Sequence, residues 1–234
     1  MAIEVTDFNY PSSHAQNINE VYDWLTENAV EYFPGGIVKD GSSNWIACYP
    51  TAEDSRTRMA IPFYNNNNAV QGHIITRYTP DDRVAIVNPN ATGYNAHAYR
   101  KAVKTENGFA LLADGTGATW FVSRTEGGTV CTVAIGTNTY NSTNSFRFVL
   151  ADLERGNQYA GSALTGSVNA LVSEHRMLSG GSHTVLVPIV FPGGTYSTNL
   201  LMTPFSQANF SADLQTVLID GQEYVYDGLF ALKG

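Results

Sequence analysis

Short apolar runs separated by turn residues fill most of the chain after residue 36, and this alternation constrains the fold more than any other feature. The runs are rich in β-branched and aromatic residues, which are favoured on the pleated surface of a sheet. Such an arrangement is typical of a mainly β fold, either an antiparallel sandwich or a barrel-like meander. The candidate strands are 45–49, 58–64, 73–78, 84–87, 99–104, 109–112, 119–123, 129–135 and 146–150.

Two turn sequences indicate how neighbouring strands connect. Ala113-Asp114-Gly115-Thr116-Gly117 separates the run 109–112 from the run 119–122, and Glu126-Gly127-Gly128 precedes the run 129–133. Glycine and aspartate favour the backbone angles that tight turns require. The middle of the chain is therefore predicted to be a meander of consecutive hairpins.

One amphipathic helix is predicted near the start of the chain, within residues 12–34. Its apolar residues recur every three to four positions and so share one face, and Pro34-Gly35-Gly36 is a stop signal for it. The apolar stripe is either part of the core or a docking surface for other subunits. As a candidate assembly interface it comprises Ile18, Val21, Tyr22, Leu25 and Tyr32.

The chain is predicted to divide into the helix at 12–34, a β-rich body at 37–155, a flexible connection at 156–182 and a C-terminal β segment at 183–234. Small and polar residues dominate the connection, which is why we expect a break there. The C-terminal segment either belongs to the same domain as the body or forms a second one. Pro188 interrupts its first apolar run, which predicts an edge strand or a bulge.

The end of the chain predicts a tight hairpin. The run 216–219 is followed by Asp220-Gly221, a dipeptide that adopts the positive backbone angles of a two-residue turn, and then by the run 223–226. We expect Val217, Ile219 and Val225 to help bury one face of this hairpin against the body, together with Leu229 and Phe230.

The charge of the chain argues against nucleic acid and anionic membranes as partners. The 21 acidic residues exceed the 13 basic ones and give a formal net charge of −8, and the longest basic cluster is Arg100-Lys101 with Lys104 nearby. A chain without a basic stripe cannot neutralise many phosphates. No run approaches the ~18 apolar residues of a membrane span, and the first residues do not resemble a signal peptide. We therefore expect synthesis in a cytosol and no membrane insertion.

Cysteines and histidines give no pattern for a cofactor or a metal. Cys48 and Cys131 are too few for a disulfide framework and too far apart for a zinc motif, so two buried thiols are expected, although pairing between them stays open. No phosphate-binding loop or nucleophile elbow is present. We expect no enzyme activity, no catalytic residue, no cofactor and no metal. The histidines, which lack metal-ligand spacing, are His14, His73, His97, His175 and His183.

Two alternatives to a purely structural role remain open. A glycosidase needs two carboxylates that distant strands can supply, and its candidates are Asp81, Asp82, Asp114, Asp152 and Glu154. An adhesin or carbohydrate-binding module needs exposed aromatic rings that stack on sugars. Its candidate ligand-facing aromatics are Trp45, Tyr64 and Tyr94.

Three parts of the chain carry a resemblance to a known family: the helix residues 19–25 (NEVYDWL), the run 186–191 (LVPIVF), and residues 221–224, 227–228 and 231–233 at the end. With these segments at both ends, the chain resembles accessory virion structural proteins of tailed bacteriophages and prophages of gut Gram-positive bacteria.

The resemblance implies a location in the virion after synthesis in the host cytoplasm. It also implies a structural role in capsid decoration, a head fibre, or tail or baseplate attachment. The partners would be other virion proteins and further copies of the chain in a homo-oligomer. A cell-surface glycan would be the ligand in the adhesin alternative.

Overall fold

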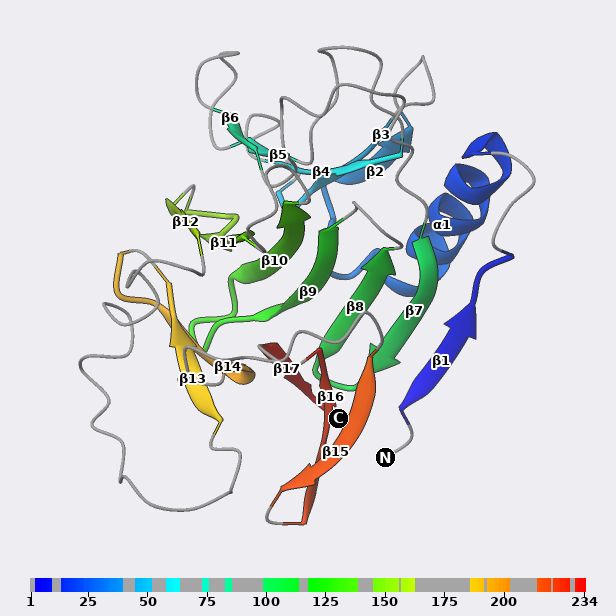
Figure 1. Ribbon diagram of the computed structural model, residues 1–234. Coiled ribbons are helices and arrows are strands. Elements are labelled where there is room, and N and C mark those ends of the chain that lie inside the picture. The colour runs from blue at the N-terminus through cyan, green and yellow to red at the C-terminus, as the bar shows by residue number, and fades with distance from the viewer. Residues whose placement is uncertain are drawn as a thin grey trace.

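The computed structural model is mainly β and antiparallel, with a single helix among the residues that it describes (Figure 1), which confirms the predicted fold class. Its strands form three sheets, of seven, five and five strands. The structure describes residues 3–9, 14–39, 45–51, 58–63, 73–75, 83–85, 99–113, 118–138, 145–155, 157–162, 186–191, 193–202, 214–219, 221–227 and 230–234.

A seven-stranded sheet, here the central sheet, forms the middle of the molecule. Its strands follow the order β1-β7-β8-β9-β10-β11-β12, so that β7 to β12 are a meander in which each strand pairs with the next in sequence. The predicted hairpin between 109–112 and 119–122 is present as the antiparallel pair β8 and β9. The strands are β1 (Glu4–Asp7), β7 (Tyr99–Thr105), β8 (Gly108–Ala113), β9 (Ala118–Arg124), β10 (Val130–Asn138), β11 (Ser145–Asp152) and β12 (Asn157–Ser162).

Both faces of the central sheet are buried. In β9, Trp120 and Val122 belong to one core cluster and Phe121 belongs to the other, and all three side chains are fully buried. Side chains of consecutive strand residues point to opposite faces, so a strand covered on both sides needs apolar residues at consecutive positions. This requirement accounts for continuous apolar runs such as Phe109-Ala110-Leu111-Leu112 in β8.

The first face of the central sheet is covered by the helix α1 (His14–Asn28) and by an N-terminal sheet (Figure 1). Trp24, Tyr32 and Phe33 contact Phe109 of β8 edge-on, with ring centroids 5.7, 5.7 and 6.2 Å apart. The N-terminal sheet is a second meander, ordered β2-β3-β4-β5-β6. Its strands are β2 (Gly36–Lys39), β3 (Trp45–Tyr49), β4 (Arg58–Pro62), β5 (His73–Ile75) and β6 (Arg83–Ala85).

The second face of the central sheet is covered by a C-terminal sheet. Phe230 of that sheet contacts Phe121 of β9 with ring centroids 6.4 Å apart, so the C-terminal segment packs directly on the body. Pro188 lies in the outermost strand, where the register shifts, which confirms the predicted edge strand with a bulge. The order is β13-β14-β17-β16-β15, formed by β13 (Val187–Val190), β14 (Tyr196–Met202), β17 (Phe230–Lys233), β16 (Gln222–Tyr226) and β15 (Gln215–Ile219).

Five strands lie outside the predicted runs, namely β1, β2, β12, β14 and β17, and two of them form the edges of the central sheet. Residues 157–162 were assigned to a flexible connection, but they form β12, an edge strand paired with β11. Residues 4–7 form β1, the opposite edge, paired with β7. Small, polar or charged residues give little β signal, yet an edge strand needs only one hydrogen-bonded neighbour. The rest of the predicted connection, 163–182, lies outside the described residues.

The helix ends earlier than predicted. Regular α-helix stops at Asn28, whose side chain caps the carbonyl of Trp24 at 3.0 Å, and the chain continues in tight turns to residue 35. In these turns the N–H of Tyr32 bonds to the carbonyl of Ala29 at 3.0 Å. The apolar spacing persists because Tyr32 and Phe33 remain buried after the helical hydrogen bonding has ended.

A buried asparagine ties the helix to the central sheet. The side chain of Asn17 donates to the carbonyl of Tyr99 at 2.8 Å and accepts from the N–H of Tyr99 at 2.9 Å. Tyr99 lies at a register shift between β7 and β8, where regular pairing is interrupted. Asn17 therefore satisfies two backbone groups that the sheet ladder cannot reach, and it sets the height of the helix over the sheet.

Asn17→Ala is expected to lower the free energy of unfolding by about 2–4 kcal/mol, because two buried backbone groups lose their partner. Denaturant unfolding measures the change. Asn19→Ala is the matched control, since Asn19 is on the same helix, is exposed and accepts an exposed hydrogen bond from the Lys39 side chain at 2.7 Å, so its effect should stay within about 0.5 kcal/mol. Equal losses for the two variants would contradict the anchoring role.

Candidate functional site

The helix stripe proposed as a candidate assembly interface lies inside the molecule. Ile18, Val21, Leu25 and Tyr32 are buried in the core between the helix and the central sheet, and Tyr22 packs against that core while partly exposed. A side chain that the chain's own core already covers is not available to another subunit. Of the two predictions for this stripe, the structure therefore confirms the core and not the docking surface. The tertiary packing decides this, because an apolar stripe has the same spacing whichever surface covers it.

The three candidate ligand-facing aromatics are not brought together by the described structure. Trp45 is the first residue of β3, and only its backbone is described. Tyr64 and Tyr94 lie outside the described residues. Of the other aromatic residues, Tyr99 and Trp120 are fully buried, and the indole N–H of Trp120 donates to the Tyr99 hydroxyl at 3.0 Å.

Most of the titratable residues considered for chemistry also fall outside the described part of the chain. This holds for His97, His175 and His183, and for Asp81, Asp82 and Asp114, while His14 and His73 are described in their backbone alone. Within the described ranges, no group of three or more histidine, cysteine, aspartate or glutamate residues is placed to hold a metal ion. Asp152 and Glu154 are the glycosidase candidates whose surroundings can be described.

Asp152 lies at the centre of a polar network between the central and C-terminal sheets. Its side chain is fully buried, and its Oδ2 accepts hydrogen bonds from the hydroxyls of Thr129 at 3.0 Å and Thr195 at 2.9 Å. Its Oδ1 accepts from the N–H of Arg155 at 3.2 Å, and the Arg155 side chain approaches to 3.7 Å. A buried carboxylate with several donors is well compensated for the loss of water.

This network connects strands. Thr129 precedes β10, Asp152 ends β11 and Thr195 precedes β14, so one carboxylate joins two layers of the fold. Glu154 contributes in the same region by accepting from the N–H of Val130 at 2.9 Å. Both glycosidase candidates that the structure describes are thus engaged in holding backbone and hydroxyl groups of neighbouring strands.

Asp152→Ala is expected to lower the free energy of unfolding by about 3 kcal/mol, because two hydroxyls and a backbone N–H lose a buried charged acceptor. Asp23→Ala, at an exposed helix position, should change it by less than about 0.5 kcal/mol. Thermal and denaturant unfolding of both variants make the comparison. An Asp152→Ala protein as stable as its control would show that the network is dispensable.

The two cysteines are free and buried, in different core clusters, as the sequence predicted for unpaired thiols. Burial raises the pKa of the Cys48 thiol far above its usual value. Burial, followed by the negative charge of Asp152, likewise raises the pKa of the Cys131 thiol. Reaction of a cysteine requires the thiolate, so the burial and the raised pKa values predict low reactivity of both thiols in the folded protein.

An aromatic disulfide reagent at pH 8 is expected to modify neither thiol in the native protein and both thiols in denaturant. The raised pKa values also predict the direction in which the free energy of unfolding changes with pH. Above the unfolded-state pKa of about 8.5 the unfolded chain loses thiol protons that the folded chain keeps, so the free energy of unfolding should fall as the pH rises from 8 to 10. Rapid labelling of the native protein would contradict the buried placement.

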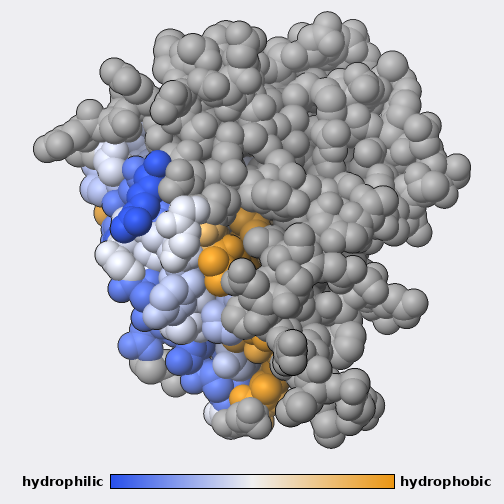
Figure 2. Space-filling model, turned by 90° about the vertical axis from the view of Figure 1, so that its left-hand side faces the viewer, coloured by the Kyte–Doolittle hydropathy of each residue, from blue (hydrophilic) through white to orange (hydrophobic). Residues whose placement is uncertain are grey.

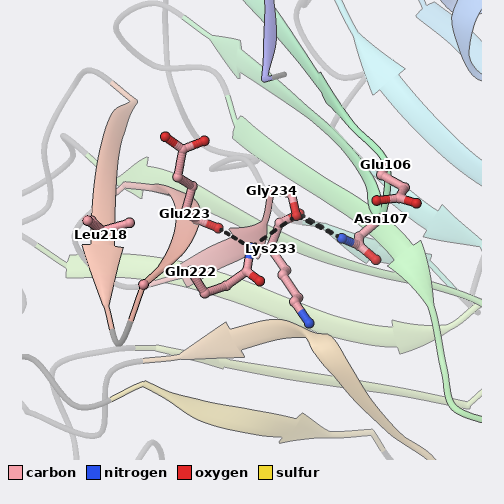
Figure 3. A pocket seen from close by; sticks show the side chains of 8 residues that line it. Glu106, Asn107, Leu218, Gln222, Glu223, Lys233 and Gly234 are labelled. Carbon is pink, nitrogen blue, oxygen red and sulfur yellow. Dashed lines mark hydrogen bonds between the residues drawn. The ribbon is translucent and has the colours of Figure 1, made fainter. Parts of the chain in front are cut away.

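A polar hollow of about 630 Å³ lies where the end of the chain meets the β7–β8 turn (Figure 3). The carbonyl of Gly234 accepts from the side-chain amides of Asn107 at 3.0 Å and Gln222 at 3.2 Å. The Thr105 hydroxyl donates to the carbonyl of Lys233 at 2.8 Å. Asn107 and Thr105 therefore fasten the end of the last strand to the central sheet, while Gln222 holds it within the C-terminal sheet. The described residues that line the hollow are Glu106, Asn107, Leu218, Gly221, Gln222, Glu223, Lys233 and Gly234.

The charges of this hollow are mixed. Glu106 and Glu223 supply carboxylates and Lys233 supplies an ammonium group, so the lining can hydrogen-bond a small polar ligand, and its described residues include no paired nucleophile and base. Sequence reasoning did not identify these residues. The Asn107-Gly108 dipeptide, a common turn signal, could have located the β7–β8 turn, but nothing local indicated that the chain end would lie beside it.

The terminal hairpin has the predicted turn and a different distribution of apolar residues. Ile219 pairs with Gln222, which leaves two residues for the turn, and Gly221 has a φ of +78°. Thr216 pairs with Val225, so Thr216 and Leu218 share the face of the buried Val225. Val217 and Ile219 lie on the opposite, half-buried face, which corrects the prediction that they share one buried face with Val225.

Leu218 is exposed although it continues the core face of the C-terminal sheet. Its side chain is 70 % exposed, because the β15–β16 hairpin extends beyond the strands of the central sheet (Figure 1). Among the described residues, the other exposed large apolar side chains are spread over several elements. The face in Figure 2 accordingly shows small apolar areas next to hydrophilic and neutral residues. These other side chains are Val5, Val30, Val38, Val190 and Tyr196.

Comparison of the chain with protein-family models, with curated proteins and with solved structures found no match. In the described part of the chain, no helix has the length and apolarity needed to cross a membrane.

Proposed function

We propose that the protein is a structural accessory subunit of a bacteriophage virion and works by protein–protein assembly. The location is the particle, in capsid decoration, a head fibre, or tail or baseplate attachment. The proposed partners are other virion proteins and further copies of the same chain. No catalytic step is proposed.

The observation that carries this proposal is that the buried polar side chains bind the chain's own backbone and hydroxyl groups. Asn17 holds the helix on β7, and Asp152 joins the central and C-terminal sheets. Asp227 accepts from the N–H of Phe230 at 2.7 Å and closes the turn between β16 and β17. An active site positions such groups toward a substrate. Here they bind the chain's own backbone and hydroxyls, as in a protein built for rigidity.

Two of the segments that carry the phage resemblance support the same proposal through their positions. Residues 186–191 include the edge strand β13, and residues 221–224 belong to the turn and strand of the terminal hairpin, whereas residues 19–25 lie in α1, whose apolar face is buried. Edge strands and protruding hairpins are the elements through which β proteins join neighbours. An acidic chain with a three-layer core also suits a particle exterior, because like charge keeps it off packaged DNA.

Mass spectrometry of purified particles tests the proposal. Phage or induced prophage particles that encode the chain are purified, separated into heads and tails, and quantified. We expect the chain in one fraction at a copy number comparable with other structural proteins, and a cytosolic host protein of similar abundance serves as the control. Recovery of the chain only from the soluble lysate would contradict the virion location.

A glycan array distinguishes the adhesin alternative. The purified chain is applied to an array of bacterial surface glycans, and the structural proposal expects no specific binding. Specific binding that Trp45→Ala abolishes would favour the adhesin and its candidate aromatic residue. Release of sugar from the array would favour the glycosidase.

A further inference from the structure

The outer strands of the three sheets differ in how they are protected against pairing with another chain. An edge strand presents unpaired N–H and carbonyl groups, and proteins guard such edges with charges, proline or bulges. β13 carries Pro188 and a register shift, and β2 carries Lys39. β6 begins with Arg83. β1 has Glu4 and Asp7 at its two ends, so four of the outer strands have a guard.

β15 has none of these guards. Its sequence, Gln-Thr-Val-Leu-Ile, contains no charge and no proline, and its threonine, valine and isoleucine are β-branched residues, which sheets favour. β12 is also uncharged, but its Asn-Gln-Tyr-Ala-Gly-Ser sequence is rich in residues that disfavour strands. Within the described strands β15 has one neighbour, β16, so its other edge is open. Leu218 of β15 is 70 % exposed.

We propose that β15 is the contact through which two copies of this chain join, pairing antiparallel across a two-fold axis at Val217. The two C-terminal sheets would then form one continuous ten-stranded sheet. In this register Val217 lies opposite its own counterpart, and Thr216 lies opposite Leu218 of the other copy. The inference deepens the homo-oligomer part of the proposed function by naming its contact surface.

The hairpin geometry fixes which groups are available for this contact. In a two-residue hairpin the residues flanking the turn form a hydrogen-bonded pair, and such pairs alternate along the strands. The pairs that bond within the hairpin are therefore Ile219 with Gln222, Val217 with Tyr224 and Gln215 with Tyr226. Thr216 and Leu218 direct their N–H and carbonyl groups to the open edge, and the proposed register lets each bond to the other in the second copy.

The open edge is self-complementary under a two-fold axis, because the outward groups of Thr216 and Leu218 in one copy satisfy those of Leu218 and Thr216 in the other, and this selects a second copy as the occupant. Charge does not oppose the contact at this edge. The chain has a net charge of −8, so contacts between copies are repulsive wherever acidic residues meet. Antiparallel self-pairing of β1 would set Glu4 opposite Asp7 of the other copy, and like charges directly opposite are destabilising. Self-pairing of β15 brings no charge opposite another. The exposed Leu218 side chains would also meet the apolar methyl groups of Thr216.

Cysteine cross-linking tests the register. Val217→Cys places two thiols at a non-hydrogen-bonded pair, where the Cα separation of about 4.5 Å suits a disulfide. Gln215→Cys is the matched control, because it lies on the same face of the same strand. In the proposed dimer its two copies are four positions apart along the strand, about 14 Å, which is too far to bridge. The native thiols are buried and give no background.

With mild oxidation of the purified chain we expect covalent dimer from Val217→Cys and monomer from Gln215→Cys. Equal cross-linking of both variants would indicate random collision and overturn the proposal. Preferential cross-linking of Gln215→Cys would overturn the register. A Val217→Cys protein that stays monomeric would also overturn the proposal. These outcomes concern the purified chain, so they are distinguishable from failure of the virion location, which particle composition decides.

Thr216→Pro tests the same contact in solution. Proline removes an N–H that points to the open edge, so β15 can still pair with β16 while the second copy loses two hydrogen bonds. We expect the dimer dissociation constant, measured by sedimentation equilibrium, to rise about tenfold or more. Leu218→Lys, which guards the edge with a charge, should act in the same direction and covers the case in which the proline variant does not fold. Glu223→Gln on β16 is the control, and unchanged association in both edge variants would overturn the proposal.

Discussion

Burial of the central sheet on both faces is the constraint on which the rest of the structure depends. One cluster of side chains from β7 to β11 packs against the helix and the N-terminal sheet, and the alternate residues pack against the C-terminal sheet. Neither covering layer could keep its own apolar face dry without the sheet between them. A fully buried large apolar side chain contributes roughly 1.5–3 kcal/mol. Phe109 contacts Trp24 on one face of the sheet and Phe121 contacts Phe230 on the other, so these two rings help to hold both covering layers in place.

The polar groups inside the molecule serve this layered arrangement. Asn17 satisfies backbone groups at a register shift, and Asp152 accepts hydrogen bonds from hydroxyls that belong to two different layers. Each group is used where an apolar contact alone would leave the relative position of two elements undefined. Such contacts add specificity of position, while the apolar contacts supply most of the free energy.

The outer strands connect this architecture with the proposed role in assembly. A protein that buries its helix and both faces of its main sheet has few apolar faces left for partners, so its contacts must come from edges and protruding elements. The terminal hairpin is such an element, since it extends past the central sheet and carries apolar residues on both faces. Its polar hollow, by contrast, results from fastening the chain end beside the β7–β8 turn.

The sequence by itself determined the type of most elements: one helix, a meander of strands and a hairpin closed by Asp220-Gly221. These follow from local periodicity and turn chemistry, which act between residues close in the chain. Only the tertiary structure decided which surface covers each apolar face. The stripe of Ile18, Val21 and Leu25 has the same spacing whether a neighbouring subunit or the chain's own sheet buries it. Likewise the strand at 4–7 pairs with a strand far away in the chain, and the strand at 157–162 consists of residues with little strand preference. The hydrogen bonds of an edge strand are supplied by its neighbour and leave no pattern in its own residues.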